Sequence, residues 1–154
     1  MVRIIKTTVS LFFMLMIFAT GNIISQEVSL CQVIGKDVKT VIQKFGKPQH
    51  HDNSNPSMEC VYYQSNTSRM AFIADKNGVY QIQADYYYNS RNSADKAMDT
   101  FLSKCGTKEM VIDTVNSGDY KIAGSGVRIE LTLFENTYSK KYEVKIKASQ
   151  SENK

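Results

Sequence analysis

One stretch of the chain, residues 70–88, constrains the fold more than any other because a turn sequence separates two segments of alternating polarity. The turn is Asp75-Lys76-Asn77-Gly78. A two-residue Asn77-Gly78 loop would divide the apolar residues between the two faces of a hairpin, whereas a three-residue loop with Gly78 in the left-handed region keeps them together. We therefore predict the second register, in which Phe72 pairs with Ile82, Ala74 with Tyr80 and Met70 with Ala84.

The second strand of this hairpin continues the alternation beyond the turn. Tyr86 and Tyr88 extend its buried side, while the opposite side carries Gln81, Gln83, Asp85 and Tyr87. One apolar face and one polar face are typical of an antiparallel sheet that is packed on one side only.

Two later segments, 127–134 and 141–148, also alternate between apolar and polar residues, except that Phe134 stands at a polar position. This period of two predicts strands that pair across residues 135–140 and place Glu and Lys side chains on the solvent face. Residues 149–154 contain no apolar side chain, so we predict that they form a disordered tail.

Two helices are predicted from apolar residues at spacings of three and four. The first spans residues 36–45 and should end at Gly46, with Pro48 preventing its continuation. The second should begin after Ser93, a residue that favours the N-cap, and end before Gly106. Residues 49–57 are polar and are predicted to form a loop.

These elements predict an α+β domain over residues 26–148, in the order α-β-β-β-α-β-β-β(-β). The expected architecture is a single antiparallel sheet of six to seven strands with both helices on one face. The similar order of the two halves also suggests a distant internal duplication.

Residues 1–25 resemble a signal peptide rather than part of the fold. Arg3 and Lys6 precede an unbroken apolar run over residues 11–19, which is shorter than the roughly 20 residues that span a bilayer. Cleavage could follow Gly21 or Ser25, and we favour Ser25. The chain is therefore predicted to be exported, with no transmembrane span after cleavage.

Charge argues against nucleic acid as a partner. Without residues 1–25 the chain loses two of its 19 Lys and Arg, which leaves 17 against 15 Asp and Glu. Nucleic-acid binding depends on a clustered positive excess, so this near balance predicts no nucleic-acid binding.

Three cysteines, Cys31, Cys60 and Cys105, lie beyond the predicted leader. Disulfides form in the oxidising compartments that exported proteins enter. Three cysteines allow three pairings, each leaving one thiol, and the sequence does not select among them.

One cluster carries side chains of the metal-ligand type, namely His50, His51, Asp52 and Cys60. A zinc site needs three or four converging ligands, but neighbouring residues of an extended segment point in opposite directions. Catalysis by Cys60 and a histidine would need a third orienting group and an oxyanion hole, for which there is no signature. We therefore predict no catalytic residue, no cofactor and no metal, with this cluster as the alternative.

Tyrosine pairs and triplets supply a candidate interaction surface. Alternation must expose some rings of Tyr62-Tyr63 and Tyr86-Tyr87-Tyr88, and exposed aromatic rings on a sheet favour partner binding. We select Tyr63 and Tyr87 as the candidates.

The run from Ile34-Gly35-Lys36-Asp37-Val38 through Phe45-Gly46-Lys47-Pro48 resembles two families. In the small outer-membrane lipoproteins of the β-barrel assembly machinery, and in β-lactamase-inhibitor-like domains, a helix ends in Gly-x-Pro and leads into antiparallel strands. The resemblance implies a binding or assembly module of the cell envelope without catalytic residues. This chain lacks the lipidated cysteine of the lipoproteins, so the resemblance does not extend to membrane anchoring.

Together these features predict a non-catalytic exported domain that binds an envelope or extracellular protein. Two alternatives are a small metal-dependent or Cys/His enzyme that uses residues 50–60, and a carrier of an apolar ligand between helices and sheet.

Overall fold

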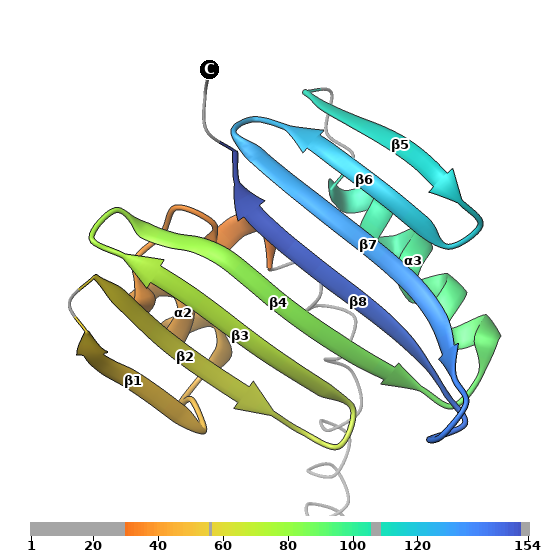
Figure 1. Cartoon of the computed structure of the whole chain (residues 1–154), viewed down its shortest axis with the longest axis horizontal. Coiled ribbons are helices and arrows are strands. Elements are labelled where there is room, and N and C mark those ends of the chain that lie inside the picture. The colour runs from red at the N-terminus through yellow and green to blue at the C-terminus, as the bar shows by residue number, and fades with distance from the viewer. Residues whose placement is uncertain (1–29, 56, 106–108, 152–154) are drawn as a thin grey trace, which may run out of the picture.

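A computed structural model describes residues 30–55, 57–105 and 109–151 of the 154-residue chain (Figure 1). The predicted signal peptide, residues 1–25, lies outside the described residues. The helical elements are η1 (Cys31–Val33), α2 (Val38–Phe45) and α3 (Arg91–Cys105). The strands are β1 (His50–Asn55), β2 (Met58–Gln64), β3 (Ser68–Asp75), β4 (Gly78–Tyr88), β5 (Met110–Asn116), β6 (Asp119–Gly124), β7 (Val127–Asn136) and β8 (Lys141–Gln150).

All eight strands form one antiparallel sheet in the order β1-β2-β3-β4-β8-β7-β6-β5. Each half of the chain contributes a helix followed by a four-stranded meander, and the last strands of the two halves, β4 and β8, pair at the centre (Figure 1). The α+β class is confirmed. The predicted strand number of six to seven and the predicted order were wrong, because the first half contains four strands rather than three.

The strand that the sequence did not predict is β1, which was expected to be a loop. All six residues of β1, His-His-Asp-Asn-Ser-Asn, are exposed, so no apolar alternation marks the strand. It pairs only with β2, and its register shifts between Asp52 and Asn55. An irregular polar edge strand of this kind protects a sheet against pairing with other chains.

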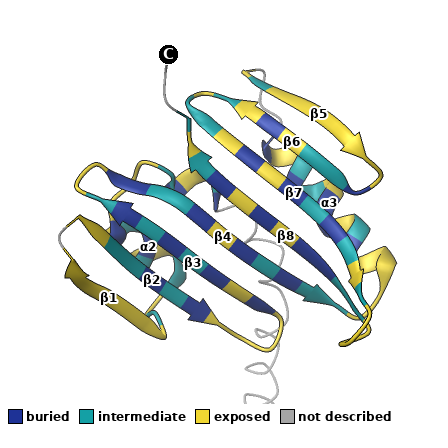
Figure 2. Ribbon diagram, viewed as in Figure 1, coloured by how far each residue is buried: buried dark blue, intermediate teal, exposed yellow. Residues whose placement is uncertain are grey.

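Both helices lie on the same face of the sheet, behind the strands in Figure 1. Burial alternates along β3 and β7 (Figure 2), with the buried residues facing the helices. The core beneath α2 includes a cluster of three aromatic rings, in which Phe72 lies 5.0 Å from Phe45 and 5.9 Å from Tyr63 between centroids. The largest fully buried side chains elsewhere include Tyr86, Phe101, Leu30, Ile82, Ile122, Ile129 and Leu131.

Two of the three predicted pairs of the β3–β4 hairpin are confirmed, but the predicted three-residue loop was wrong, because Asp75 pairs with Gly78 across a two-residue loop. Phe72 pairs with Ile82 and Met70 with Ala84. Ala74 pairs with Val79 instead of Tyr80, because the register shifts between Ile73 and Ala74 rather than at Gly78.

Helix ends differ from the prediction by a few residues. Asp37 caps α2 by accepting a hydrogen bond from the Thr40 amide, and Gly46 follows the helix at φ 83°. α3 begins at Arg91, and the hydroxyl of Ser90, rather than that of Ser93, accepts a hydrogen bond from a helix amide, that of Ser93. The predicted stop at Gly106 lies outside the described residues.

The predicted tail begins later than expected. Ser149 and Gln150 belong to β8, and the amide of Ser151 donates to the Gly126 carbonyl. Residues 152–154 lie outside the described part of the chain.

The tip of the β3–β4 hairpin packs against the segment that precedes α2. The amide of Gly35 donates to the Val79 carbonyl, and the amide of Val79 donates to the Lys36 carbonyl, both at 2.8 Å. A Cβ atom at Gly78 would lie 2.8 Å from the Lys36 carbonyl oxygen. Two features therefore require glycine at position 78, namely the close backbone contact and the φ of 109°.

We predict that Gly78→Ala destabilises the domain more than Gly46→Ala does. Both glycines have positive φ, which costs an alanine about 1–2 kcal/mol, but a Cβ at Gly46 meets no atom within 4 Å. Urea unfolding should show a loss of about 1 kcal/mol for Gly46→Ala and at least about twice that for Gly78→Ala. Equal losses would contradict the backbone contact.

A second prediction concerns the cap of α2. Hydrogen bonds from the side chain and amide of Thr40 lower the pKa of Asp37, so the folded state favours the carboxylate. This contribution to stability is present above the carboxyl's ordinary pKa and is lost as pH falls through the lowered value. The stability difference between wild type and Asp37→Ala should therefore be largest near neutral pH and shrink below about pH 3.8. Urea titrations from pH 7 to pH 3 measure it, with Asp37→Asn as a cap that does not titrate.

Candidate functional site

The face of the sheet opposite the helices is not covered by any described element (Figure 1). Strand register defines the residues of this open face, because it places every second residue of each strand there. Across the centre of the sheet the open face carries Tyr62, Ala71, Gln83, Lys147 and Glu130 in one row of paired neighbours.

A hollow of about 620 Å³ lies over the middle of the open face. Strands in a sheet twist relative to one another, which makes such a broad face curved. The hollow extends over β2, β3, β4, β8 and β7. Its side-chain lining combines both charges with polar and aromatic groups, namely Tyr62, Arg69, Ala71, Gln83, Asp85, Glu130, Thr132, Lys145 and Lys147.

At this hollow the Arg69 side chain contacts two neighbours, Tyr87 and Asp85. Its guanidinium carbon lies 5.4 Å from the centroid of the Tyr87 ring, its Nε donates a hydrogen bond to the Tyr87 hydroxyl, and its Nη2 lies 3.6 Å from Asp85 Oδ2. The register explains this grouping, since Arg69 pairs directly with Asp85. These contacts hold an arginine and a tyrosine in defined positions.

The environment changes the acid–base properties of this pair. The hydrogen bond from Arg69 to Tyr87 raises the pKa of the guanidinium, while partial burial raises the pKa of the Tyr87 hydroxyl. Arg69 therefore remains charged and Tyr87 neutral at physiological pH.

A second cation lies over a ring farther along the same face. The Nζ of Lys145 is 4.9 Å from the centroid of Phe134. Cation–π contacts of this type contribute about 0.5–1 kcal/mol when exposed, so they orient the lysine without neutralising it.

The structure separates the two tyrosines selected from the sequence. Tyr87 lies on the open face, as alternation predicts. Tyr63 is 8% exposed, packs on the helix face, and donates its hydroxyl hydrogen to the Gly46 carbonyl. Its neighbour Tyr62 is the member of that pair on the open face, where its hydroxyl donates to Gln64.

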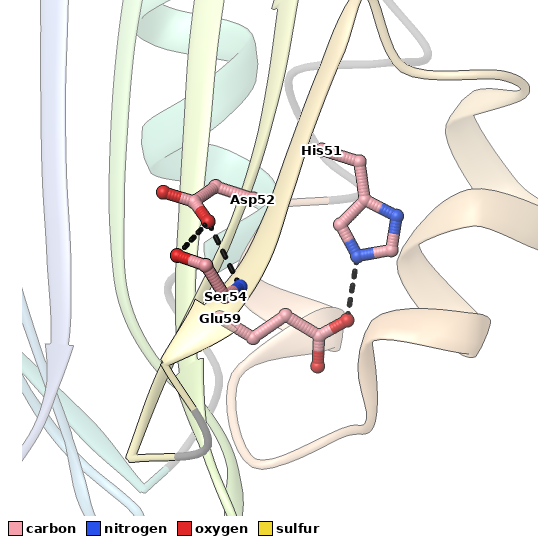
Figure 3. Close-up of polar contacts among 4 residues, drawn as sticks. All are labelled: His51, Asp52, Ser54 and Glu59. Carbon is pink, nitrogen blue, oxygen red and sulfur yellow. Dashed lines mark hydrogen bonds and ion pairs between the residues drawn. The ribbon is translucent and has the colours of Figure 1, made fainter.

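The candidate metal ligands are divided between the two faces of β1. His51 pairs with Val61, which is fully buried on the helix face, and its Nε2 lies 2.6 Å from Glu59 Oε1 (Figure 3). Asp52 pairs with Cys60 on the other face. The adjacent histidines therefore do not converge on one point.

Asp52 is engaged with its own strand. Its carboxylate accepts hydrogen bonds from the amide and hydroxyl of Ser54 (Figure 3), and these bonds lower its pKa. Burial, in contrast, raises the pKa of the Cys60 thiol. Within residues 30–55, 57–105 and 109–151, no group of three His, Cys, Asp or Glu side chains could hold a metal ion.

A smaller hollow, of about 370 Å³, lies where α2 ends against β2 and β3. Apolar atoms of Phe45, Tyr63 and Met70 line one part of it, but the rest is polar, with Lys47, Gln49, Gln64, Ser65 and Ser68. An apolar ligand would therefore meet a mixed surface here.

Comparison with known proteins does not assign the chain to a protein family. No protein-family model matches the chain, and no curated protein is similar to it in sequence. Among the solved structures that match are two distantly similar proteins. A cysteine-rich secretory protein from Staphylococcus aureus is 12% identical with a TM-score of 0.46, and the match covers 80% of this chain and 46% of that one. An extracellular protein containing an SCP domain from Bacillus anthracis is 12% identical with a TM-score of 0.45, and the match covers 79% and 45%.

The chain thus spans about half the length of each solved structure that it matches. Neither is described as an assembly lipoprotein or a β-lactamase-inhibitor-like protein, so the resemblance at residues 34–48 stays a prediction. In the described residues neither helix is long and apolar enough to cross a membrane.

Sequence reasoning missed Arg69 as a member of the site. The signal was present in the hairpin register, which places Arg69 opposite Asp85 on the face away from Met70 and Phe72. A search among exposed tyrosines does not find Arg69, because its place in the site depends on its cross-strand position rather than on its residue type.

We predict that divalent metal does not stabilise the protein through residues 50–60. Because His50 and His51 lie on opposite faces of β1, adding equimolar zinc or removing metal with a chelator should leave the melting temperature unchanged. His51→Ala should cost less than about 1 kcal/mol, since the exposed contact with Glu59 is worth little. A zinc-dependent rise in melting temperature that is lost in both His50→Ala and His51→Ala would contradict this prediction.

Proposed function

We propose that the chain is a non-catalytic, exported binding domain that holds a segment of another protein in the hollow of its open sheet face. The observation that carries this proposal is the hollow itself, which is lined by Arg69, an arginine that contacts with the neighbouring Tyr87 hold in place. Arg and Tyr are among the residues that contribute most to binding energy at protein interfaces.

The chemistry of the lining favours a polypeptide. Asp85 and Glu130 lie among Arg69, Lys145 and Lys147, so the hollow offers both charges over a short distance. A polypeptide with mixed charge complements such a surface, whereas nucleic acid requires a predominantly positive one.

Preorganisation supports binding rather than a purely structural role. The Arg69 side chain is half exposed, at 50%, although its guanidinium contacts both Tyr87 and Asp85. An arginine held in this way loses less conformational entropy when a partner docks than a free one does.

Export is the second part of the proposal. It is supported by the charged start and short apolar run of residues 1–25, which have the pattern of a secretory signal. A partner would accordingly belong to the cell envelope or to the extracellular space.

The two alternative functions have less support. An enzyme based on residues 50–60 would need either converging metal ligands or a reactive Cys60 thiolate. His51 lies on the opposite face of β1 from His50 and Asp52, and burial raises the pKa of the Cys60 thiol. A carrier of an apolar ligand would need an apolar cavity between helices and sheet, where fully buried side chains such as Phe72 and Phe101 pack.

The test is site-specific photocrosslinking followed by binding measurements. The crosslinker p-benzoylphenylalanine at position 83, inside the hollow, should capture one partner from native envelope preparations, whereas the same group at position 138, in the exposed β7–β8 turn, should not. With that partner purified, Arg69→Ala and Tyr87→Ala should each weaken binding by at least about tenfold, as interface hot spots do.

Matched controls lie outside the hollow. Arg128 is exposed on the same face and Tyr138 is 98% exposed, so Arg128→Ala and Tyr138→Ala should leave the dissociation constant unchanged. Equal effects of the hollow and control variants, or equal crosslinking from positions 83 and 138, would overturn the proposal.

A further inference from the structure

Two of the three cysteines meet on the helix side of the molecule. Cys31 begins η1 and Cys105 ends α3, and although they are 74 positions apart their Sγ atoms lie 2.8 Å from each other. Cys105 is buried in the core, whereas Cys31 is partly exposed beside it. The fold therefore brings the two thiols into direct contact.

The third cysteine is on the other side of the sheet. Cys60 pairs with Asp52 and Ile73 along the strands, which places it on the open face, while η1 and α3 pack against the helix face. A bond from Cys60 to either of the other cysteines would have to pass through the sheet. The folded chain therefore allows one pairing of the three that the sequence permits.

We infer that Cys31 and Cys105 form a disulfide under oxidising conditions and that Cys60 remains a free thiol. An S–S bond measures about 2.05 Å, so the sulfur atoms need to approach by less than about 1 Å. The inference depends on the proposed export only because export would bring the chain into an oxidising compartment. It does not depend on the proposed binding site.

The reaction balances with a low-molecular-weight disulfide, such as oxidised glutathione, as the oxidant. The thiolate of one cysteine attacks one sulfur of the oxidant, which forms a mixed disulfide and releases one glutathione. The thiolate of the other cysteine then attacks the protein sulfur of this mixed disulfide and displaces the second glutathione. The two cysteines lose two electrons and two protons, and the oxidant accepts them as two thiols.

The electrostatics of the pair favour Cys105 as the thiolate that forms first. The contact with Cys31 lowers the pKa of Cys105, whereas the same contact and burial raise the pKa of Cys31. One of the two thiols thus ionises readily next to the other. In contrast, burial raises the pKa of Cys60, and Cys60 has no second thiol beside it.

The bond would connect the two halves of the domain on the helix side. Cys31 precedes the helix of the first half, and Cys105 ends the helix of the second half. A cross-link between positions so distant in sequence restricts the unfolded chain strongly, so the oxidised protein should be considerably more stable than the reduced one.

Thiol counting on the purified chain tests the inference. The reduced, folded protein is incubated in a glutathione buffer that contains mostly the disulfide form, denatured, and treated with a maleimide. Intact mass should show one modified thiol, rising to three after reduction, and peptide mapping should link Cys31 to Cys105.

The variants give a matched comparison. Cys60→Ser should show no reactive thiol after oxidation and keep the wild-type melting temperature, whereas Cys31→Ser and Cys105→Ser should each show two and melt roughly 10 °C lower than oxidised wild type. Three reactive thiols in oxidised wild type, or a linked peptide that contains Cys60, would overturn the inference. The wild-type thiol count decides the question even if a serine variant does not fold.

Discussion

The pairing of β4 with β8 is the constraint on which the rest of the structure depends. Each half of the chain is a helix followed by a four-stranded meander, and only this pairing makes the two meanders a single sheet. It extends from Gln81 opposite Ser149 to Tyr88 opposite Tyr142. On the helix face it places Ile82 beside Ala148 and Ala84 beside Ile146, so the apolar surfaces of the two halves form one core.

The elements with the strongest alternation could be predicted from the sequence, because burial on one face imposes a period of two. The register of Phe72 with Ile82 and the pairing of residues 127–134 with 141–148 follow from this rule. β1 could not be predicted in the same way. An edge strand whose two faces are both exposed, such as His50–Asn55, leaves no polarity pattern, and its backbone hydrogen bonds to β2 carry no sequence signal.

The candidate site, like the fold, could be predicted only in part from the alternation of apolar and polar residues. Alternation placed Tyr87 on the open face, but it could not decide between Tyr62 and Tyr63, because either phase of β2 is consistent with a short strand. The structure resolves the choice through packing: the ring of Tyr63 lies edge-on to Phe72, with an interplanar angle of 90°. The hollow itself could not be predicted from the sequence. It is lined partly by β7 and β8, and no local sequence pattern shows that these strands lie in the same sheet as β3.

The position of β8 has a consequence for how the molecule is assembled. Because β8 lies at the centre of the sheet, between β4 and β7, the first meander keeps an unfilled hydrogen-bonding edge along β4 until residues 141–150 have been synthesised. Contacts between segments so distant in sequence form late and slowly. The apolar face of the first meander therefore gains its β8 neighbours only after all of α3, β5, β6 and β7 has been synthesised.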